Sequence, residues 1–193
     1  QPGVMEIEAN MHGLVCETDR LDYDQARAAL IENKVPEELA GRIAGLSHLV
    51  SSLDIVRIAS KAGIKVVDAA AVYYAVGEAF CLDWLREGAR GLIGDSHWDR
   101  LAVFAIIDDL YGHQRELTAA VLADAKAEGA SILAAKSLEE KPAQAAQAIE
   151  NWRAARGVPV QRIDQLLADL RQVGKIELSM LAVANRGLRS VME

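Results

Sequence analysis

The sequence is poor in the residues that mark several classes of protein. Its 193 residues include only two cysteines and four prolines, and aromatic residues make up 5% of the chain. Cys16 and Cys81 are too few for a disulfide framework, and such low usage fits a reducing cytoplasm. No uncharged run approaches the roughly 20 residues that a membrane-spanning helix requires, and the first residues do not resemble a signal peptide. We therefore expect a cytoplasmic protein.

The sequence also lacks an excess of basic residues. Its formal net charge is −7 at pH 7. Proteins that bind nucleic acids usually carry a stripe of Lys and Arg that neutralises phosphates, and none is visible here. An anionic membrane surface would repel this chain for the same reason. We expect neither nucleic acid nor membrane among its partners.

Sequence patterns of common active sites are missing as well. There is no G-x-G-x-x-G and no G-x-x-x-x-G-K-[ST], so the chain shows no cradle for cofactor phosphates. There is no G-x-S-x-G elbow for a nucleophilic serine. Asp109, His113 and Glu116 share a helix face, but a di-iron bundle requires Glu-x-x-His, which does not occur. We therefore assign no catalytic, cofactor-binding or metal-ligating residue.

What the sequence does contain favours helices. Hydrophobic residues make up 51% of the chain, alanine is abundant, and scarce proline removes the strongest helix breaker. The length suits one substantial domain. We predict an all-α multi-helix bundle of about six to seven helices. Residues 1–18 are predicted to form a poorly patterned lead-in and 19–193 the helical bundle domain, with a subdomain hinge near 127–141.

Turn and cap residues divide the chain into predicted helices. Gly63 is a helix stop, because glycine readily adopts the left-handed conformation found there. Ser96 is predicted to cap the helix that follows it. The predicted helices span 19–33, 36–62, 68–90, 97–126, 142–156 and 160–191. A kink or restart is expected at Ser47 in the second of these, and a bend near Gly174 in the last.

The block at 46–121 is the most informative part, because its helices have almost no polar interruption. Helices that are apolar all round are expected in the middle of a bundle. The charged residues that they carry then need partners inside the protein. We therefore predict buried polar side chains, including at least one pair of a carboxylate and an arginine. The candidates are Asp54, Asp83, Arg86, Trp98, Asp108 and Arg115.

Three strings in this block resemble a known family. LDIVRIASKAG, VYYAVGEAFCLDWLREGA and HWDRLAVFAIIDDLYGHQRELTAAVL are similar to the C-terminal helical region of the large bacterial NAD-specific glutamate dehydrogenases. The upstream DYDQARAALIENKVPEELAGRIAGL and the closing VQRIDQLLADLRQVGKIELSMLAVANRGLRSV fit the same family in the same order. The resemblance covers residues 21–191.

The resemblance implies a part of an oxidoreductase of glutamate catabolism. Such enzymes deaminate L-glutamate to 2-oxoglutarate and ammonia while reducing NAD, in a central catalytic region that this sequence lacks. The resemblance therefore implies no cofactor in this chain, NAD in the parent enzyme, and a role in packing, assembly or regulation. Its partners would be the rest of the parent enzyme and other subunits.

Two alternatives remain open from the sequence. One is a stand-alone helical module for protein interaction or oligomerisation, with no enzyme activity. The other is a small helical-bundle enzyme or metal protein.

Overall fold

In a computed structural model of the protein, every secondary-structure element among the described residues is a helix. The structure describes residues 1–15, 17–129 and 137–193, and these contain no strand. The predicted all-α class is confirmed, but the described residues form more helices than the six to seven expected. The helices are α1 (Pro2–Leu14), α2 (Glu17–Glu32), α3 (Glu37–Ala44), α4 (Leu46–Leu49), α5 (Ser52–Ala62), α6 (Val66–Ala79), α7 (Leu82–Arg90), α8 (His97–Glu128), α10 (Lys141–Arg156), α11 (Val158–Gln172) and α12 (Leu178–Met192).

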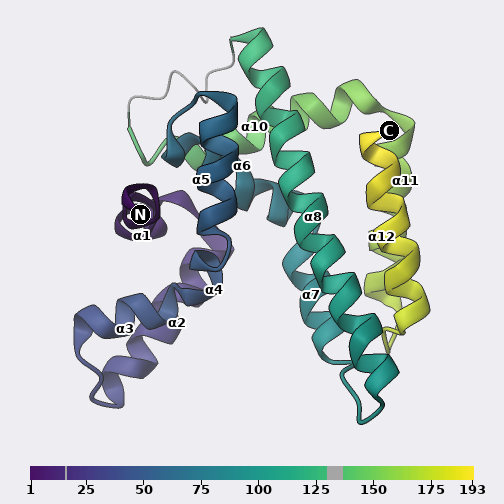
Figure 1. Cartoon of the computed structure of the whole chain (residues 1–193), viewed down its shortest axis with the longest axis horizontal. Helices are drawn as coiled ribbons and strands as arrows, with labels where there is room; N and C mark the ends of the chain where they lie inside the picture. Colours follow the sequence, from purple (N-terminus) through teal and green to yellow (C-terminus); the bar gives the residue numbers. More distant parts are fainter. Residues whose placement is uncertain (16, 130–136) are drawn as a thin grey trace.

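Helix α6 forms the centre of the molecule (Figure 1). Helices α1, α5, α8 and α10 pack around it, and most of its residues are buried. Its small side chains permit a close approach, since a Cβ added at Gly77 would lie 2.7 Å from Nε2 of Gln114 on α8. This is the position that an all-round apolar helix predicts.

Helix α8 joins this central bundle to a second group of helices. It contains 32 residues, which at the α-helical rise gives a length of about 48 Å. Helices α7 and α12 pack against it, and α11 packs against α12. The α2–α3 hairpin projects from the opposite side of the molecule (Figure 1), where α2 packs chiefly on α3. Neither α8 nor any other described helix combines the length and apolar character needed to span a membrane.

Three predicted helices are interrupted in the structure, which explains the higher helix count. The helix expected at 36–62 is divided into α3, α4 and α5. That at 68–90 is divided at Cys81, whose φ of 53° lies in the left-handed region. That at 160–191 ends at Val173, whose backbone is extended, and restarts as α12. Two of these breaks lie close to the kink expected at Ser47 and the bend expected near Gly174. The break at Cys81 was not predicted, because apolar helix-forming residues continue on both sides of it.

The lead-in expected at 1–18 is largely helical. Helix α1 buries Ile7, Met11 and Leu14, which recur at the i, i+4, i+7 spacing of one helix face. Pro2 lies in the first turn, where a missing backbone N–H costs nothing. The segment predicted as a poorly patterned lead-in thus contributes one helix face to the core.

Two cap predictions are confirmed. Gly63 follows α5 with a φ of 66°, in the left-handed conformation that glycine adopts without strain. The side chain of Ser96 caps α8 by accepting a hydrogen bond from the backbone N–H of Asp99.

Some predictions concern residues that the structure does not describe. Cys16 lies outside the described residues, while Cys81 is a half-buried free thiol. The hinge predicted near 127–141 includes residues 130–136, which also lie outside them. The division into 1–18 and 19–193 stays a prediction.

Candidate functional site

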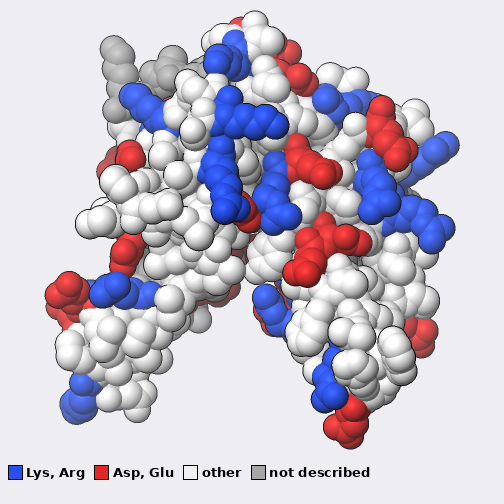
Figure 2. Space-filling model, in the orientation of Figure 1, with Lys and Arg blue, Asp and Glu red and all other residues white. Residues whose placement is uncertain are grey.

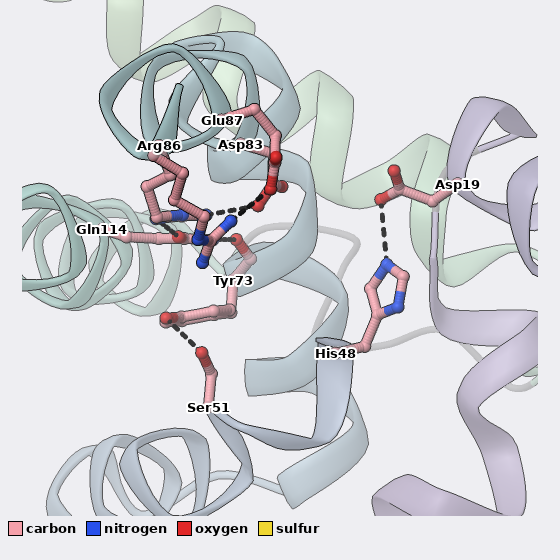
Figure 3. A network of polar contacts seen from close by, with 9 residues as sticks. Asp19, His48, Ser51, Tyr73, Asp83, Arg86, Glu87 and Gln114 are labelled. Atoms are coloured by element: carbon pink, nitrogen blue, oxygen red, sulfur yellow. Dashed lines mark hydrogen bonds and ion pairs between the residues drawn. The ribbon is translucent and has the colours of Figure 1, made fainter. Parts of the chain in front are cut away.

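A buried polar network joins α7, α8 and α6 (Figure 3). Its centre is Arg86 on α7, whose side chain is only 3% exposed. One guanidinium nitrogen donates to Oε1 of Gln114 at 2.9 Å, and another donates to Oδ1 of Asp83 at 2.6 Å. The guanidinium also lies over the ring of Tyr111, 4.3 Å from its centroid. The one cation thus binds to groups from two helices.

Gln114 extends the network to the central helix. Its Nε2 donates to the backbone carbonyl of Tyr73 at 2.9 Å, and the Tyr73 hydroxyl donates to Oγ of Ser51 at 2.9 Å. Burial raises the pKa of the Tyr73 hydroxyl, so this donor keeps its proton at neutral pH. A continuous chain of contacts therefore runs from α7 through α8 and α6 to the start of α5.

The chemistry of this network is that of a structural clamp. Arginine keeps its proton at any physiological pH and the glutamine amide does not titrate. Tyr73, with its raised pKa, is no base at neutral pH. Arg86 also keeps a buried Nε for which the described residues supply no acceptor. The arrangement fixes how the helices cross and offers no proton-transfer pair.

An ion pair beside the network joins α5 to α8. Arg115 donates to Oδ2 of Asp54 at 3.1 Å, and both side chains are partly exposed. Arg57 also approaches the Asp54 carboxylate, at 3.4 Å. Pairs with this much exposure contribute about 0–1 kcal/mol to stability, so this contact adds orientation more than free energy.

Among the predicted buried polar residues, only Arg86 is fully buried. Asp54 and Arg115 pair with each other but remain half-exposed. The predicted buried pair of a carboxylate and an arginine is found only in part, since the partner of Arg86 is exposed. Burial was wrongly predicted at outward-facing positions on α7 and α8: Asp83, Trp98 and Asp108. The reason is that α8 buries one face only, and Trp98 and Asp108 lie on the other.

The most buried ion pair was not predicted. Lys141, the first residue of α10, donates to Oδ1 of Asp68 in the first turn of α6. Their side chains are 7% and 3% exposed. In the sequence, Asp68 lies at the start of a predicted helix and Lys141 follows two glutamates, so neither residue indicates burial. No local signal pairs two residues that lie 73 positions apart.

A second unpredicted contact joins α8 to α12. The buried His113 shares a hydrogen bond of 2.6 Å with Oδ1 of Asn185, whose Nδ2 donates to Asp109 at 2.7 Å. The histidine and aspartate that the sequence placed on one helix face thus converge on an amide. Within residues 1–15, 17–129 and 137–193, no three His, Cys, Asp or Glu side chains gather as a metal site would require.

An apolar groove lies between α6 and α10. Its volume is about 200 Å³, and alanine side chains such as Ala71, Ala75 and Ala146 line it. Glu78 and Glu150 are the charged residues in its lining. Binding sites for small molecules usually add several convergent polar groups to an apolar lining, and this groove does not have them.

Comparison with known proteins identifies the chain's relatives. A family model described as "Glutamate dehydrogenase, C-terminal" matches residues 1–190. The chain is 29% identical to the NAD-specific glutamate dehydrogenase of Pseudomonas aeruginosa over 84% of its length, and 30% identical to that of Mycobacterium tuberculosis over 89%. The corresponding enzyme of Halomonas elongata is 23% identical over the whole chain.

These matches cover only a small share of each relative. The chain spans 9% of the Pseudomonas protein, 10% of the Mycobacterium protein and 11% of the Halomonas protein. The family match extends over nearly all of the chain and confirms the resemblance carried by the helical strings. The chain therefore belongs to the family of glutamate dehydrogenase C-terminal regions.

Proposed function

We propose that this chain is the non-catalytic C-terminal helical domain of a large, cytoplasmic NAD-dependent glutamate dehydrogenase. The parent reaction converts L-glutamate, NAD and water into 2-oxoglutarate, ammonia and NADH. The family match over residues 1–190 carries this proposal, together with the tenfold greater length of the relatives. The domain's role is to pack against the rest of the enzyme and support its assembly.

The geometry supports a packing role over a chemical one. The described residues form helices and no strand, so they contain no strand–turn–helix cradle of the kind that holds dinucleotide phosphates. The central polar network consists of groups that hold helices together. We place NAD and the catalytic residues in the parts of the enzyme outside this chain.

The first experiment purifies the native gene product through a C-terminal tag and measures its mass and activity. We expect a polypeptide roughly ten times longer than this chain, by the share that it spans in its relatives, with glutamate-dependent reduction of NAD. The 193-residue chain alone is expected to show none. A native product no longer than this chain, without activity, would favour the stand-alone interaction module.

The second experiment deletes this domain from the full-length enzyme. We expect the deletion to lower the temperature at which the enzyme loses its assembly, followed by light scattering and by sedimentation. Turnover per correctly assembled subunit should fall less than assembly does. Unchanged assembly and unchanged thermal inactivation would refute the packing role.

A further inference from the structure

An apolar stripe lies on the solvent-facing side of α8. Trp98 is 76% exposed, Leu101 47% and Phe104 51%. These three residues, here called the α8 stripe, recur every three positions along one side of the helix. Val103 and Leu110 face the core from the opposite side and are 1% exposed. The stripe is thus a second apolar face on a helix that already buries its first.

The sequence that flanks the stripe carries more negative than positive charge. The lower part of α8 in Figure 1 presents mostly uncharged surface in Figure 2, in contrast to the mixed charges above it. Asp95 and Asp99 are exposed near its beginning and Asp108 near its end. Arg100 is the single Lys or Arg between them in the sequence. A partner with apolar side chains at its centre and Lys or Arg at its rim would complement this face.

The stripe is too small to hold two separate molecules together. A fully exposed aromatic side chain offers on the order of 150–250 Å², so three side chains at these exposures offer roughly 300–400 Å². A stable interface buries about 800 Å² on each partner. A tethered partner needs less area, since a linker supplies an effective concentration in the range of about 1 mM. The area therefore favours a partner within the same polypeptide over a second copy of this chain.

We propose that the α8 stripe docks onto the part of the same polypeptide that precedes this chain, in an apolar depression rimmed by Lys or Arg. This inference rests on the proposed function and names the surface through which the domain packs. The relatives extend about tenfold beyond this chain, and the family is that of C-terminal regions. The exposed Trp98 is the expected anchor, because tryptophan is enriched among the residues that contribute most binding energy at interfaces.

The test compares hydroxyl-radical labelling of Trp98 in the 193-residue chain and in the full-length enzyme, by mass spectrometry. Burial of a side chain that is 76% exposed is expected to slow its labelling at least about fivefold in the full-length enzyme. Labelling of Val183 on α12, which is 50% exposed, serves as the reference. An equal labelling rate of Trp98 in both proteins would overturn the proposal.

Labelling at a series of protein concentrations tests whether a second copy of the chain binds the α8 stripe. In the 193-residue chain, labelling of Trp98 is expected to be constant between about 1 and 100 µM, the range in which a micromolar dimer would form. A fall in labelling with concentration, matched by dimers in sedimentation, would assign the stripe to a second copy and overturn the proposal.

A double variant, W98S with F104S, tests the surface in the full-length enzyme. We expect it to weaken assembly about tenfold, the effect of losing one anchor residue, while V183S leaves assembly unchanged. In the 193-residue chain the same double variant should keep its melting temperature, which shows that the fold is intact. Normal assembly of the double variant would contradict docking through the α8 stripe.

The outcomes separate the inference from the proposed function. Loss of assembly on deletion of the whole domain, with a reactive Trp98 in the intact enzyme, would retain the packing role and reject this surface. Unchanged assembly on deletion would reject the packing role itself, whatever the labelling of Trp98.

Discussion

Helix α6 and the first half of α8 both carry many apolar residues, but the structure covers them differently. Most residues of α6 are buried, including Ala69, Val72 and Val76. The first half of α8 buries only one face and exposes Trp98 and Phe104 on the other. Other helices surround α6, whereas the outer face of α8 meets solvent. Apolar composition therefore predicts that a helix face is buried. It does not indicate whether other helices of this chain or a different partner bury it.

The largest expected effect is on the buried side of this comparison. Asp68→Ala leaves the ammonium of Lys141 buried without its carboxylate, which should lower the free energy of unfolding by about 3–5 kcal/mol. Urea denaturation of the 193-residue chain measures it. The double variant D68A with K141M should recover most of the loss, since the uncompensated charge is gone. A loss below about 0.5 kcal/mol in D68A, the range of surface changes, would show that the pair is not buried.

A smaller loss is expected where α6 meets α8. Gln114→Ala removes a donor to the Tyr73 carbonyl and an acceptor for Arg86, which should cost about 1–3 kcal/mol in urea denaturation. Gln165→Ala is the matched control, because the exposed Gln165 bonds to the exposed Asp169. This change should alter stability by less than about 0.5 kcal/mol. Equal effects in the two variants would contradict the clamp.

The pH dependence of stability reports the burial of tyrosines on α6. Burial raises the pKa of the Tyr74 hydroxyl, which donates to the backbone carbonyl of His48. The unfolded chain ionises this hydroxyl near pH 10 while the folded chain holds its proton, so stability is fully present below that pH and falls as pH rises above it. The slope from one such group approaches about 1.4 kcal/mol per pH unit.

Tyr74→Phe should make this alkaline decline shallower, as measured by urea denaturation at a series of pH values above neutrality. Tyr23→Phe is the control, since Tyr23 lies on the α2–α3 hairpin, away from the centre. An identical alkaline slope in Tyr74→Phe and in the parent chain would show that Tyr74 ionises normally in the folded state.

The smallest expected effect is on the exposed face of α8. Phe104→Ala should change the stability of the 193-residue chain by no more than about 0.5 kcal/mol, because its ring already meets solvent. Val103→Ala, one position away and 1% exposed, should cost about 1–3 kcal/mol through the lost contacts and the cavity. Equal melting curves for the two variants would remove the distinction between the faces.

Local signals in the sequence were sufficient for part of the fold. Gly63 and Ser96 marked helix ends because glycine and serine act on the backbone within a few residues. The run of helix-forming residues gave the all-α class. Helix α1 was not predicted although Ile7 and Met11 share one helix face, because Pro2, Gly3 and Gly13 made the segment look poorly patterned.

The polar contacts could not be predicted in the same way. Arg86 was a candidate, but its partner Gln114 depends on how α7 crosses α8 and not on spacing along the chain. Asp68 and Lys141 meet only because α10 returns to α6. Asp108 was placed inside because residues around the whole circumference of its helix are apolar, so hydrophobicity did not distinguish the buried face from the exposed one.

Cys81 has a consequence for the shape of the whole molecule. A residue with a Cβ pays about 1–2 kcal/mol to adopt left-handed backbone angles, and Cys81 holds them between α6 and α7 while its sulfur accepts a hydrogen bond from Arg171 at the end of α11. The change of direction at this residue divides one apolar segment into α6, which packs on α5 and α10, and α7, which packs on α8 and α12. Because such backbone angles persist only where the surrounding structure holds them, loosening the contacts around Cys81 should let the angle between α6 and α7 change.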